Sequence, residues 1–304
     1  MTDMKRTSLL APVLGLRALG LLFAGATLLC GAGLERTLQV IRLLKVGSGR
    51  HLAADGVSLN GKGSYRFLID TGSSSSALEP DAARELGIQS TYTVLVESVA
   101  GAAIAPAARV TICIPNVCHD DSEVMLTQLP AVKEADSRVR GILGMDFLMR
   151  SGFVLDNSHR ELRIGPVVPE HQGAIVPLVQ VGGRLAVRAR RGDNGDSITL
   201  IIDSGTQDLV LFSRGGRTSV SGHQRAVELA TNFGAQSGSV EKIPELRLGS
   251  YVVRKLTAVV IPSKSGVDPV RGDGLIPASL SETVVFHPSG AYVVIGKAVK
   301  GRRQ

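Results

Sequence analysis

The sequence has no tryptophan and only 4 tyrosines and 7 phenylalanines among its 304 residues. No aromatic side chain interrupts its basic C-terminal run Lys297 to Arg303, which argues against nucleic-acid binding. The 6 histidines show no paired spacing of zinc ligands, so no metal site is expected. The G-x-S-x-G, phosphate-loop and dinucleotide-binding motifs are missing as well, so serine hydrolase chemistry and nucleotide use lack a motif.

Cysteine is scarce too, with 3 in the whole chain. Two of them, Cys113 and Cys118, flank the turn-like segment 114–117. Export to an oxidising compartment would permit a disulfide between them. Two unlinked thiols in a pair of strands are the alternative.

The N-terminus predicts export. Lys5 and Arg6 precede an apolar stretch, and residues 18–34 contain no charge. Small residues in this stretch fit a cleavage site, yet its length also approaches that of a short membrane span. We therefore expect residues 1–34 to be an export signal or a membrane anchor. The protein would lie in the cell envelope, either associated with the membrane through residues 18–34 or periplasmic or secreted after cleavage.

The remaining composition is that of a globular protein. Apolar residues make up 44% and charged residues 20%, while 35 glycines favour many tight turns. The formal net charge of +7 is a modest excess for this length. A chain of this size corresponds to about two globular units.

Two halves of the chain repeat each other. Residues 65–73 recur as residues 198–206, and the same offset relates Gly141-Ile142-Leu143 to Gly274-Leu275-Ile276. Residues 153–165 and 284–296 match at a slightly shorter offset. Residues 166–173, with two prolines, form a credible connector. The repeat predicts an N-terminal lobe at 35–168 and a C-terminal lobe at 169–304.

Each half reads as short strands separated by turns, as at Asn60-Gly61 and residues 193–196. A helix is expected over 80–86, because proline suits the first helical turn and Gly87 suits the C-terminal cap. Another is expected over 145–149. The predicted class is therefore mainly β with a few short helices.

The repeated motif carries chemistry. Asp70-Thr71-Gly72-Ser73 and Asp203-Ser204-Gly205-Thr206 each follow an apolar, β-branched run. Such a run places a carboxylate at the exposed end of a buried strand, and the glycine lets the backbone turn back. Two adjacent carboxylates can share one proton and so activate a water molecule.

These motifs, with Ile142-Leu143-Gly144, resemble the aspartic peptidases. The segment 141–148 looks especially like the bacterial retropepsin-like group. The resemblance covers most of residues 45–296 and implies a bilobal acid protease barrel fold, with two β lobes related by a pseudo-twofold axis. It implies an endopeptidase that acts on peptide or protein substrates without a cofactor.

The resemblance also assigns roles to individual residues. Asp70 and Asp203 would be the catalytic pair, and the Thr71 and Ser204 hydroxyls would brace the two loops. Hydroxyls of Ser73 and Thr206 would bond the outer carboxylate oxygens, which predicts an acidic optimum. The loop supports and flap candidates it implies are Thr71, Gly72, Ser73, Ser204, Gly205 and Thr206, and Ala100, Gly101, Phe233 and Gly234.

Two departures from the family pattern stand out. Pro277 occupies the position that Gly144 has in the first half, and neither flap candidate has a tyrosine. Besides an enzyme, the sequence leaves open a non-catalytic peptide-binding envelope protein on the same fold. Both aspartates and both flanking hydroxyls favour the enzyme, because a binder has no need for two facing like charges.

Overall fold

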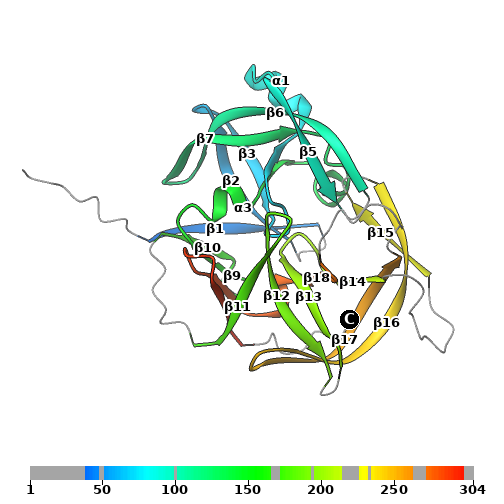
Figure 1. The fold of residues 1–304 in the computed structure, drawn as a ribbon. Coiled ribbons are helices and arrows are strands. Elements are labelled where there is room, and N and C mark those ends of the chain that lie inside the picture. Colours follow the sequence, from blue (N-terminus) through cyan, green and yellow to red (C-terminus); the bar gives the residue numbers. More distant parts are fainter. Residues whose placement is uncertain are drawn as a thin grey trace, which may run out of the picture. The chain divides into compact units, whose positions relative to one another are not determined.

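The computed structural model describes residues 38–47, 51–98, 101–165, 172–192, 195–213, 226–231, 234–262 and 272–297. All of these belong to one compact unit, Arg36–Gln304. Most of them lie in β-strands, with three short α-helices and one 3-10 turn among the described residues (Figure 1). The prediction of a mainly β protein is confirmed.

The first half forms a closed ring of hydrogen-bonded strands. Around the ring, each strand pairs with the next in the order β2, β3, β8, β4, β7, β6 and back to β2. We call this ring the first barrel. Its strands are β2 (His51–Leu59), β3 (Lys62–Ile69), β8 (Val139–Leu143), β4 (Ser76–Leu78), β7 (Val117–Leu126) and β6 (Gly101–Ile114). β5 (Tyr92–Ser98) pairs with β6 to form a hairpin.

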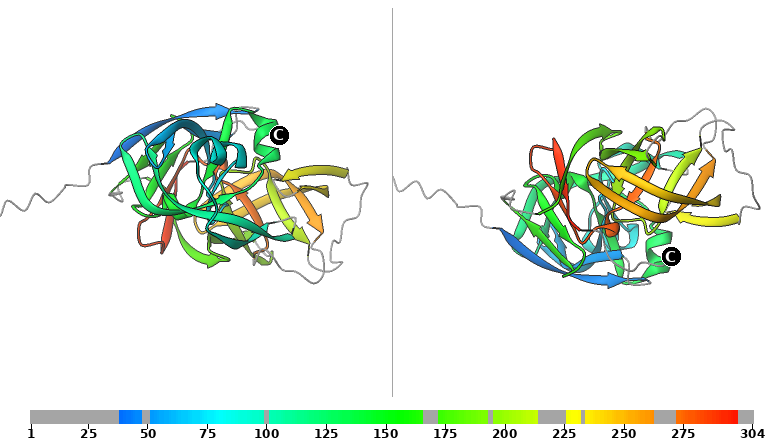
Figure 2. Two further views of the ribbon diagram at one scale, coloured as in Figure 1. Left: turned by 90° about the horizontal axis from the view of Figure 1, so that it is seen from above. Right: turned by 90° about the horizontal axis from the view of Figure 1, so that it is seen from below.

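The second half repeats this pairing order strand for strand. The ring β12, β13, β18, β14, β17, β16 and back to β12 is the second barrel. Its strands are β12 (Arg184–Arg191), β13 (Ser197–Asp203), β18 (Gly274–Pro277), β14 (Leu209–Ser213), β17 (Tyr251–Pro262) and β16 (Gly234–Leu248). β15 (Ala226–Thr231) pairs with β16, as β5 pairs with β6. Figure 2 shows the β15–β16 hairpin, in yellow, from two further directions.

A six-stranded antiparallel sheet joins the two barrels. Its order is β1 (Gln39–Val46), β10 (Glu161–Ile164), β9 (Phe153–Asp156), β19 (Thr283–Phe286), β20 (Tyr292–Ile295) and β11 (Ala174–Val181). The halves meet where β9 pairs with β19, and there the buried Phe153 and Phe286 rings stack at 4.6 Å. Strands from both halves thus share one hydrogen-bonded sheet.

Local sequence explains the turns and helices that were expected. The turn between β2 and β3 is made by Asn60 and Gly61, both with positive φ, as suits a tight hairpin. α1 (Pro80–Leu86) begins with proline and ends at Gly87, which is left-handed at φ 71°. α3 (Met145–Leu148) lies where the second helix was expected. α2 (Pro130–Ala135) and the 3-10 turn η1 (Ala278–Leu280) were not predicted.

The β6–β7 hairpin carries the structure's disulfide. Cys113 and Cys118 are paired across the two strands, and their sulfur atoms are bonded. The intervening turn includes Asn116 with a positive φ of 65°. The turn therefore brings the two cysteines directly opposite each other.

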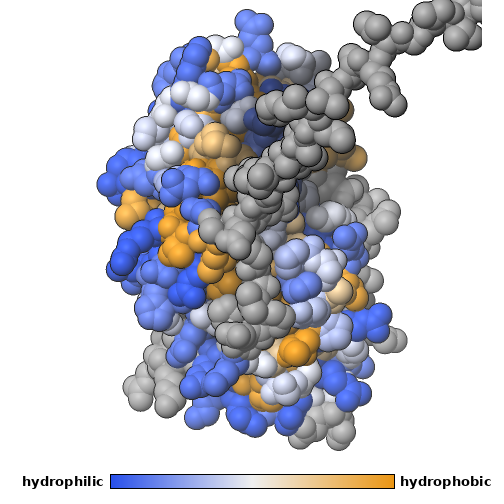
Figure 3. Space-filling view, turned by 90° about the vertical axis from the view of Figure 1, so that its left-hand side faces the viewer, coloured by the Kyte–Doolittle hydropathy of each residue, from blue (hydrophilic) through white to orange (hydrophobic). Residues whose placement is uncertain are grey.

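The surface is mixed in character. On the face shown in Figure 3, apolar residues occur in small groups between polar ones. The large exposed apolar side chains of β1 and β11 include Val40 and Ile175. Within the described residues, no helix has the length and apolar character needed to cross a membrane. Residues 18–34, for which a signal or anchor was predicted, lie outside the described residues.

Candidate active site

Asp70 and Asp203 lie at equivalent places in the two barrels. Asp70 directly follows β3, which runs parallel to β8, and its backbone N–H donates to the Leu143 carbonyl at 3.0 Å. Asp203 ends β13, which runs parallel to β18. Both strands are buried and apolar just before the aspartate, because each is covered on both faces. The buried strands therefore fix both carboxyl groups at one location.

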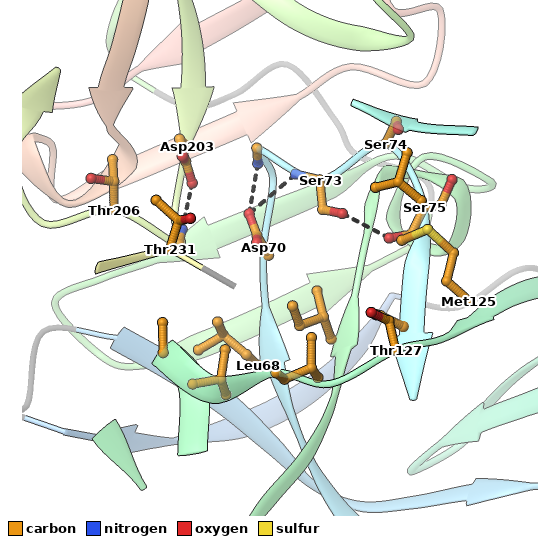
Figure 4. Close-up of a pocket in the computed structure, with 18 of the residues that line it drawn as sticks. Leu68, Asp70, Ser73, Ser74, Ser75, Met125, Thr127, Asp203, Thr206 and Thr231 are labelled. Carbon is orange, nitrogen blue, oxygen red and sulfur yellow. Dashed lines mark hydrogen bonds between the residues drawn. The ribbon is translucent and has the colours of Figure 1, made fainter. Parts of the chain in front are cut away.

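Backbone N–H groups hold one oxygen of each carboxyl group. The N–H groups of Gly72 and Ser73 donate to Asp70 Oδ1 at 2.9 and 3.2 Å. The N–H of Gly205 donates to Asp203 Oδ1 at 2.7 Å. Figure 4 shows the two aspartates beside each other, each with these bonds to its own loop.

The two glycines allow the carboxyl groups to approach. A β-carbon added to Gly72 would lie 2.4 Å from Asp203 Cγ, and one added to Gly205 would lie 2.8 Å from Asp70 Cγ. Real β-carbons do not make contacts this short. A side chain at either position would therefore collide with the carboxyl group of the opposite barrel, so both positions need glycine.

Four hydrogen bonds between Thr71 and Ser204 and their surroundings brace the two loops. Thr71 Oγ1 donates to the Ile202 carbonyl at 2.8 Å and accepts from the Ser204 N–H at 3.0 Å. Ser204 Oγ donates to the Ile69 carbonyl at 2.7 Å and accepts from the Thr71 N–H at 3.0 Å. Thr71 is fully buried. The structure thus brings together the two hydroxyls that the resemblance assigned to bracing.

The hydroxyls of Ser73 and Thr206 are placed differently from the sequence-based expectation. Ser73 Oγ donates to the Ser75 carbonyl at 2.7 Å, and Thr206 Oγ1 donates to the Asp208 carbonyl at 3.2 Å. A hydroxyl has one proton to give, so neither can also donate it to a carboxylate. The prediction that these hydroxyls bond the outer carboxylate oxygens is wrong, because each caps its own turn instead.

Burial decides the protonation of the pair. It raises the pKa of Asp70, although hydrogen bonds from the Gly72 N–H and Asp203 oppose the rise. The pKa of Asp203 is raised well above its ordinary value, first by burial and then by the nearby Asp70 charge. Two buried like charges this close do not both ionise readily. Burial of both groups and the charge of Asp70 beside Asp203 therefore favour protonation within the pair.

The two carboxyl groups open into a cavity of about 730 Å³. Both barrels line it, and so does α2, which supplies Val132 and Glu134. The first barrel contributes a largely apolar wall around Leu68 and Met125 (Figure 4). A cavity of this size accommodates several residues of an extended peptide.

The hairpins chosen as flap candidates border the cavity. Val94, Leu95 and Val96 of β5, and Leu229 and Thr231 of β15, line it. Of the candidate flap residues, Gly101 and Gly234 begin β6 and β16, whereas Ala100 and Phe233 lie outside the described residues. The cavity therefore has one such hairpin from each barrel.

His51 and Arg184 are among the lining residues that sequence reasoning missed. They are the first residues of β2 and β12, and they are related by the offset that relates the two aspartates. Each directly precedes a leucine that belongs to the repeat, so the repeat register could have indicated them. Apart from Pro130 at its start, no feature of the sequence indicated α2.

A second difference between the two barrels explains why proline can occupy position 277. In the first barrel, the Gly144 N–H donates to Ser76 Oγ at 3.1 Å. In the second barrel, Leu209 occupies the position of Ser76 and has no acceptor oxygen. Pro277 has no N–H to satisfy, so the two changes compensate each other.

No group of three or more histidine, cysteine or acidic residues that could hold a metal ion occurs in the described part of the chain. The two carboxyl groups have chemistry of their own. They can hold a water molecule between them, accept a proton from it and donate the shared proton elsewhere.

Comparison with known proteins bears on this site. Residues 56–147, which cover most of the first barrel, match the family described as aspartyl protease. Among solved structures, the chain is similar to a retropepsin-like aspartic protease from Rickettsia conorii at 21% identity. That match has a TM-score of 0.32 and covers 43% of this chain and 91% of the other. No curated protein sequence matches the chain. The resemblance to the aspartic peptidases is confirmed for the matched residues of the first half.

Proposed function

We propose that this protein is an aspartic endopeptidase that cleaves peptide bonds with a water molecule activated between Asp70 and Asp203. The observation that carries the proposal is the pair of buried carboxyl groups, each against the glycine of the opposite loop. Such a pair is costly to bury, and the Thr71 and Ser204 bonds hold it in place. No described feature favours the alternative of a non-catalytic binder.

In the proposed reaction, one aspartate is ionised and the other is protonated. The ionised carboxylate accepts a proton from the bound water as the water oxygen attacks the peptide carbonyl carbon. The protonated carboxyl donates its proton to the carbonyl oxygen, which gives a neutral tetrahedral intermediate. The C–N bond then breaks as the amine nitrogen takes the proton from the pair, and a hydroxyl of the intermediate returns its proton to the pair, so one proton remains shared and the new carboxyl group is released.

The surrounding structure supports peptide binding. The hairpins β5–β6 and β15–β16 both line the cavity, so an extended peptide would lie between them and the carboxyl pair. The repeated strand order supports a bilobal fold with a pseudo-twofold axis, with lobes at 35–168 and 169–304. Two hairpins over one site fit a fused retropepsin-like dimer.

The proposed location is the cell envelope. The leader composition supports export, through a cleaved signal or an anchor in residues 18–34. The bond between Cys113 and Cys118 is consistent with an oxidising compartment. Peptides or proteins of that compartment would be the substrates.

The test is a peptide-library digest by the full-length chain, followed by mass spectrometry. Wild type should produce defined internal cleavages, while Asp70→Asn and Asp203→Asn should each remove nearly all of them. Asp196→Asn makes the same chemical change at an exposed position seven residues before Asp203 and should leave the cleavages unchanged. A wild type that cleaves no peptide, or an Asp70→Asn protein that cleaves at close to the wild-type rate, would overturn the proposal.

A further inference from the structure

His51 and Arg184 occupy equivalent positions on opposite sides of the cavity. Each is the first residue of the second strand of its half, and both line the cavity. Arg184 follows the two-residue turn Gly182-Gly183, whose positive φ angles of 55° and 75° turn β11 tightly into β12. The turn and the strand thus fix the backbone position from which the Arg184 side chain extends.

Each of these two positions lies beside the loop that follows the aspartate of the other barrel. The Gln207 side-chain amide donates to His51 Nε2 at 2.7 Å, and Gln207 belongs to the loop after Asp203. A β-carbon on Gly183 would lie 3.5 Å from Ser74 Cβ, in the loop after Asp70. Arg184 therefore lies at the Asp70 end of the cavity, and His51 lies at the Asp203 end.

The two ends differ in charge. Histidine gains or loses its charge between about pH 5 and 8. Arginine keeps its positive charge at all working pH values. Charge from Arg184 lowers the pKa of Asp70, against the larger rise caused by burial. The Arg184 charge is therefore felt at the catalytic pair.

The other charged residues of the cavity wall are acidic. Glu123, Glu134 and Asp208 line it beside the catalytic pair, and Asp208 lies on the Asp203 loop at the opposite end from Arg184. Arg184 is the only lysine or arginine among the described lining residues. Its side chain is largely buried, with 8% of the residue exposed. A substrate carboxylate that enters this wall therefore meets a fixed positive charge at one end only.

We propose that Arg184 binds an acidic side chain of the peptide, so that the protein cleaves peptides with Asp or Glu on one side of the scissile bond. This inference rests on the proposed peptidase function and adds its substrate class. The guanidinium group has five N–H donors and can pair with a carboxylate through two parallel bonds while it keeps bonds to the protein. In an extended peptide, alternate side chains face the same wall, so the preference falls at a defined position.

The first test compares cleavage of matched peptides by the full-length chain. A library digest identifies the preferred position, and two fluorogenic peptides are then made that differ only by Glu or Gln there. Wild type should favour the Glu peptide in kcat/KM by about tenfold or more. Arg184→Gln should lose this preference, and Arg184→Glu should favour a Lys peptide. Arg188→Gln removes the same charge at an exposed position on the same strand and should behave like wild type.

Two further variants keep the test decisive if Arg184→Gln does not fold. Arg184→Lys keeps the positive charge and should retain an acidic preference, reduced because lysine cannot form the paired bonds. His51→Arg should create a second acidic preference on the other side of the scissile bond. Wild type with no acidic preference at any position, or a preference that survives Arg184→Gln, overturns the inference.

A binding measurement separates this inference from the proposed function. In the Asp203→Asn background, the dissociation constants of labelled Glu and Gln peptides, captured from the same library, are measured by fluorescence anisotropy. If wild type cleaves nothing but binding still depends on Arg184, the peptidase proposal fails and the inference stands. If cleavage depends on Asp70 but neither cleavage nor binding depends on Arg184, the inference fails and the peptidase proposal stands.

Discussion

Removing the Thr71 hydroxyl should destabilise the protein through the loss of two buried hydrogen bonds. Thr71→Val keeps the β-branched shape but leaves the Ile202 carbonyl and the Ser204 N–H without the partner they have at 2.8 and 3.0 Å. Thr71 is fully buried, so water cannot replace the hydroxyl. An unsatisfied buried polar group costs about 1–3 kcal/mol, so the two together should cost about 2–6 kcal/mol.

The assay is urea unfolding of the full-length chain, followed by circular dichroism at one pH and temperature. Thr93→Val makes the same substitution at an exposed position of β5 and should change the unfolding free energy by less than about 0.5 kcal/mol. Peptide cleavage by Thr71→Val should also fall, because the two catalytic loops lose a shared bond. If the unfolding free energy of Thr71→Val equals that of wild type at an unchanged m-value, the brace has no energetic role.

Two more predictions concern the disulfide and the carboxyl pair. Mass spectrometry of the unreduced protein should show Cys113 and Cys118 bonded, and reduction should lower stability by about 2 kcal/mol; two free thiols in envelope-derived protein would contradict this. Because burial raises the pKa of Asp203 in the folded state, folding favours its protonated form, and that stability is lost as pH rises above the ordinary aspartate range. Asp203→Asn should therefore unfold at higher urea than wild type at pH 7, with a smaller difference near pH 4. An equal difference at both pH values would show that ionisation of Asp203 does not oppose folding.

The sequence predicted the parts of the site that depend on strand ends and repeats. The apolar runs before Asp70 and Asp203 placed both carboxyl groups at the ends of buried strands. The tight turn at Asn60-Gly61 and the helix that begins at Pro80 followed from local backbone preferences. These features could be predicted because few neighbouring residues determine them.

Hydrogen bonds for which several acceptors compete, and contacts between the two barrels, could not be predicted. Ser73 and Thr206 have hydroxyls near a carboxylate, but each donates to a carbonyl two residues further along its own loop. A sequence does not show which acceptor a hydroxyl will choose. Arg184 likewise lines the cavity where the Gly182-Gly183 turn of one barrel approaches the loop after Asp70 of the other.

The placement of the Ser73 and Thr206 hydroxyls changes the expected pH dependence. The acidic optimum was expected because hydroxyl donors would lower the pKa values of the pair. The structure leaves burial as the largest effect on both aspartates, and it raises their pKa values. The form with one shared proton should therefore persist to higher pH than the sequence suggested.

The pH profile of kcat/KM for one good peptide tests the shared proton most directly. Activity requires one proton on the pair, so the profile should be bell-shaped, falling when both groups are protonated and again when both are ionised. Its alkaline limb should lie well above the ordinary pKa of aspartate, since the pKa of Asp203 is strongly raised. The exposed Asp196→Asn control should give the same profile. An alkaline limb at the ordinary aspartate pKa, or a rate that keeps rising with pH, would contradict a proton shared between Asp70 and Asp203.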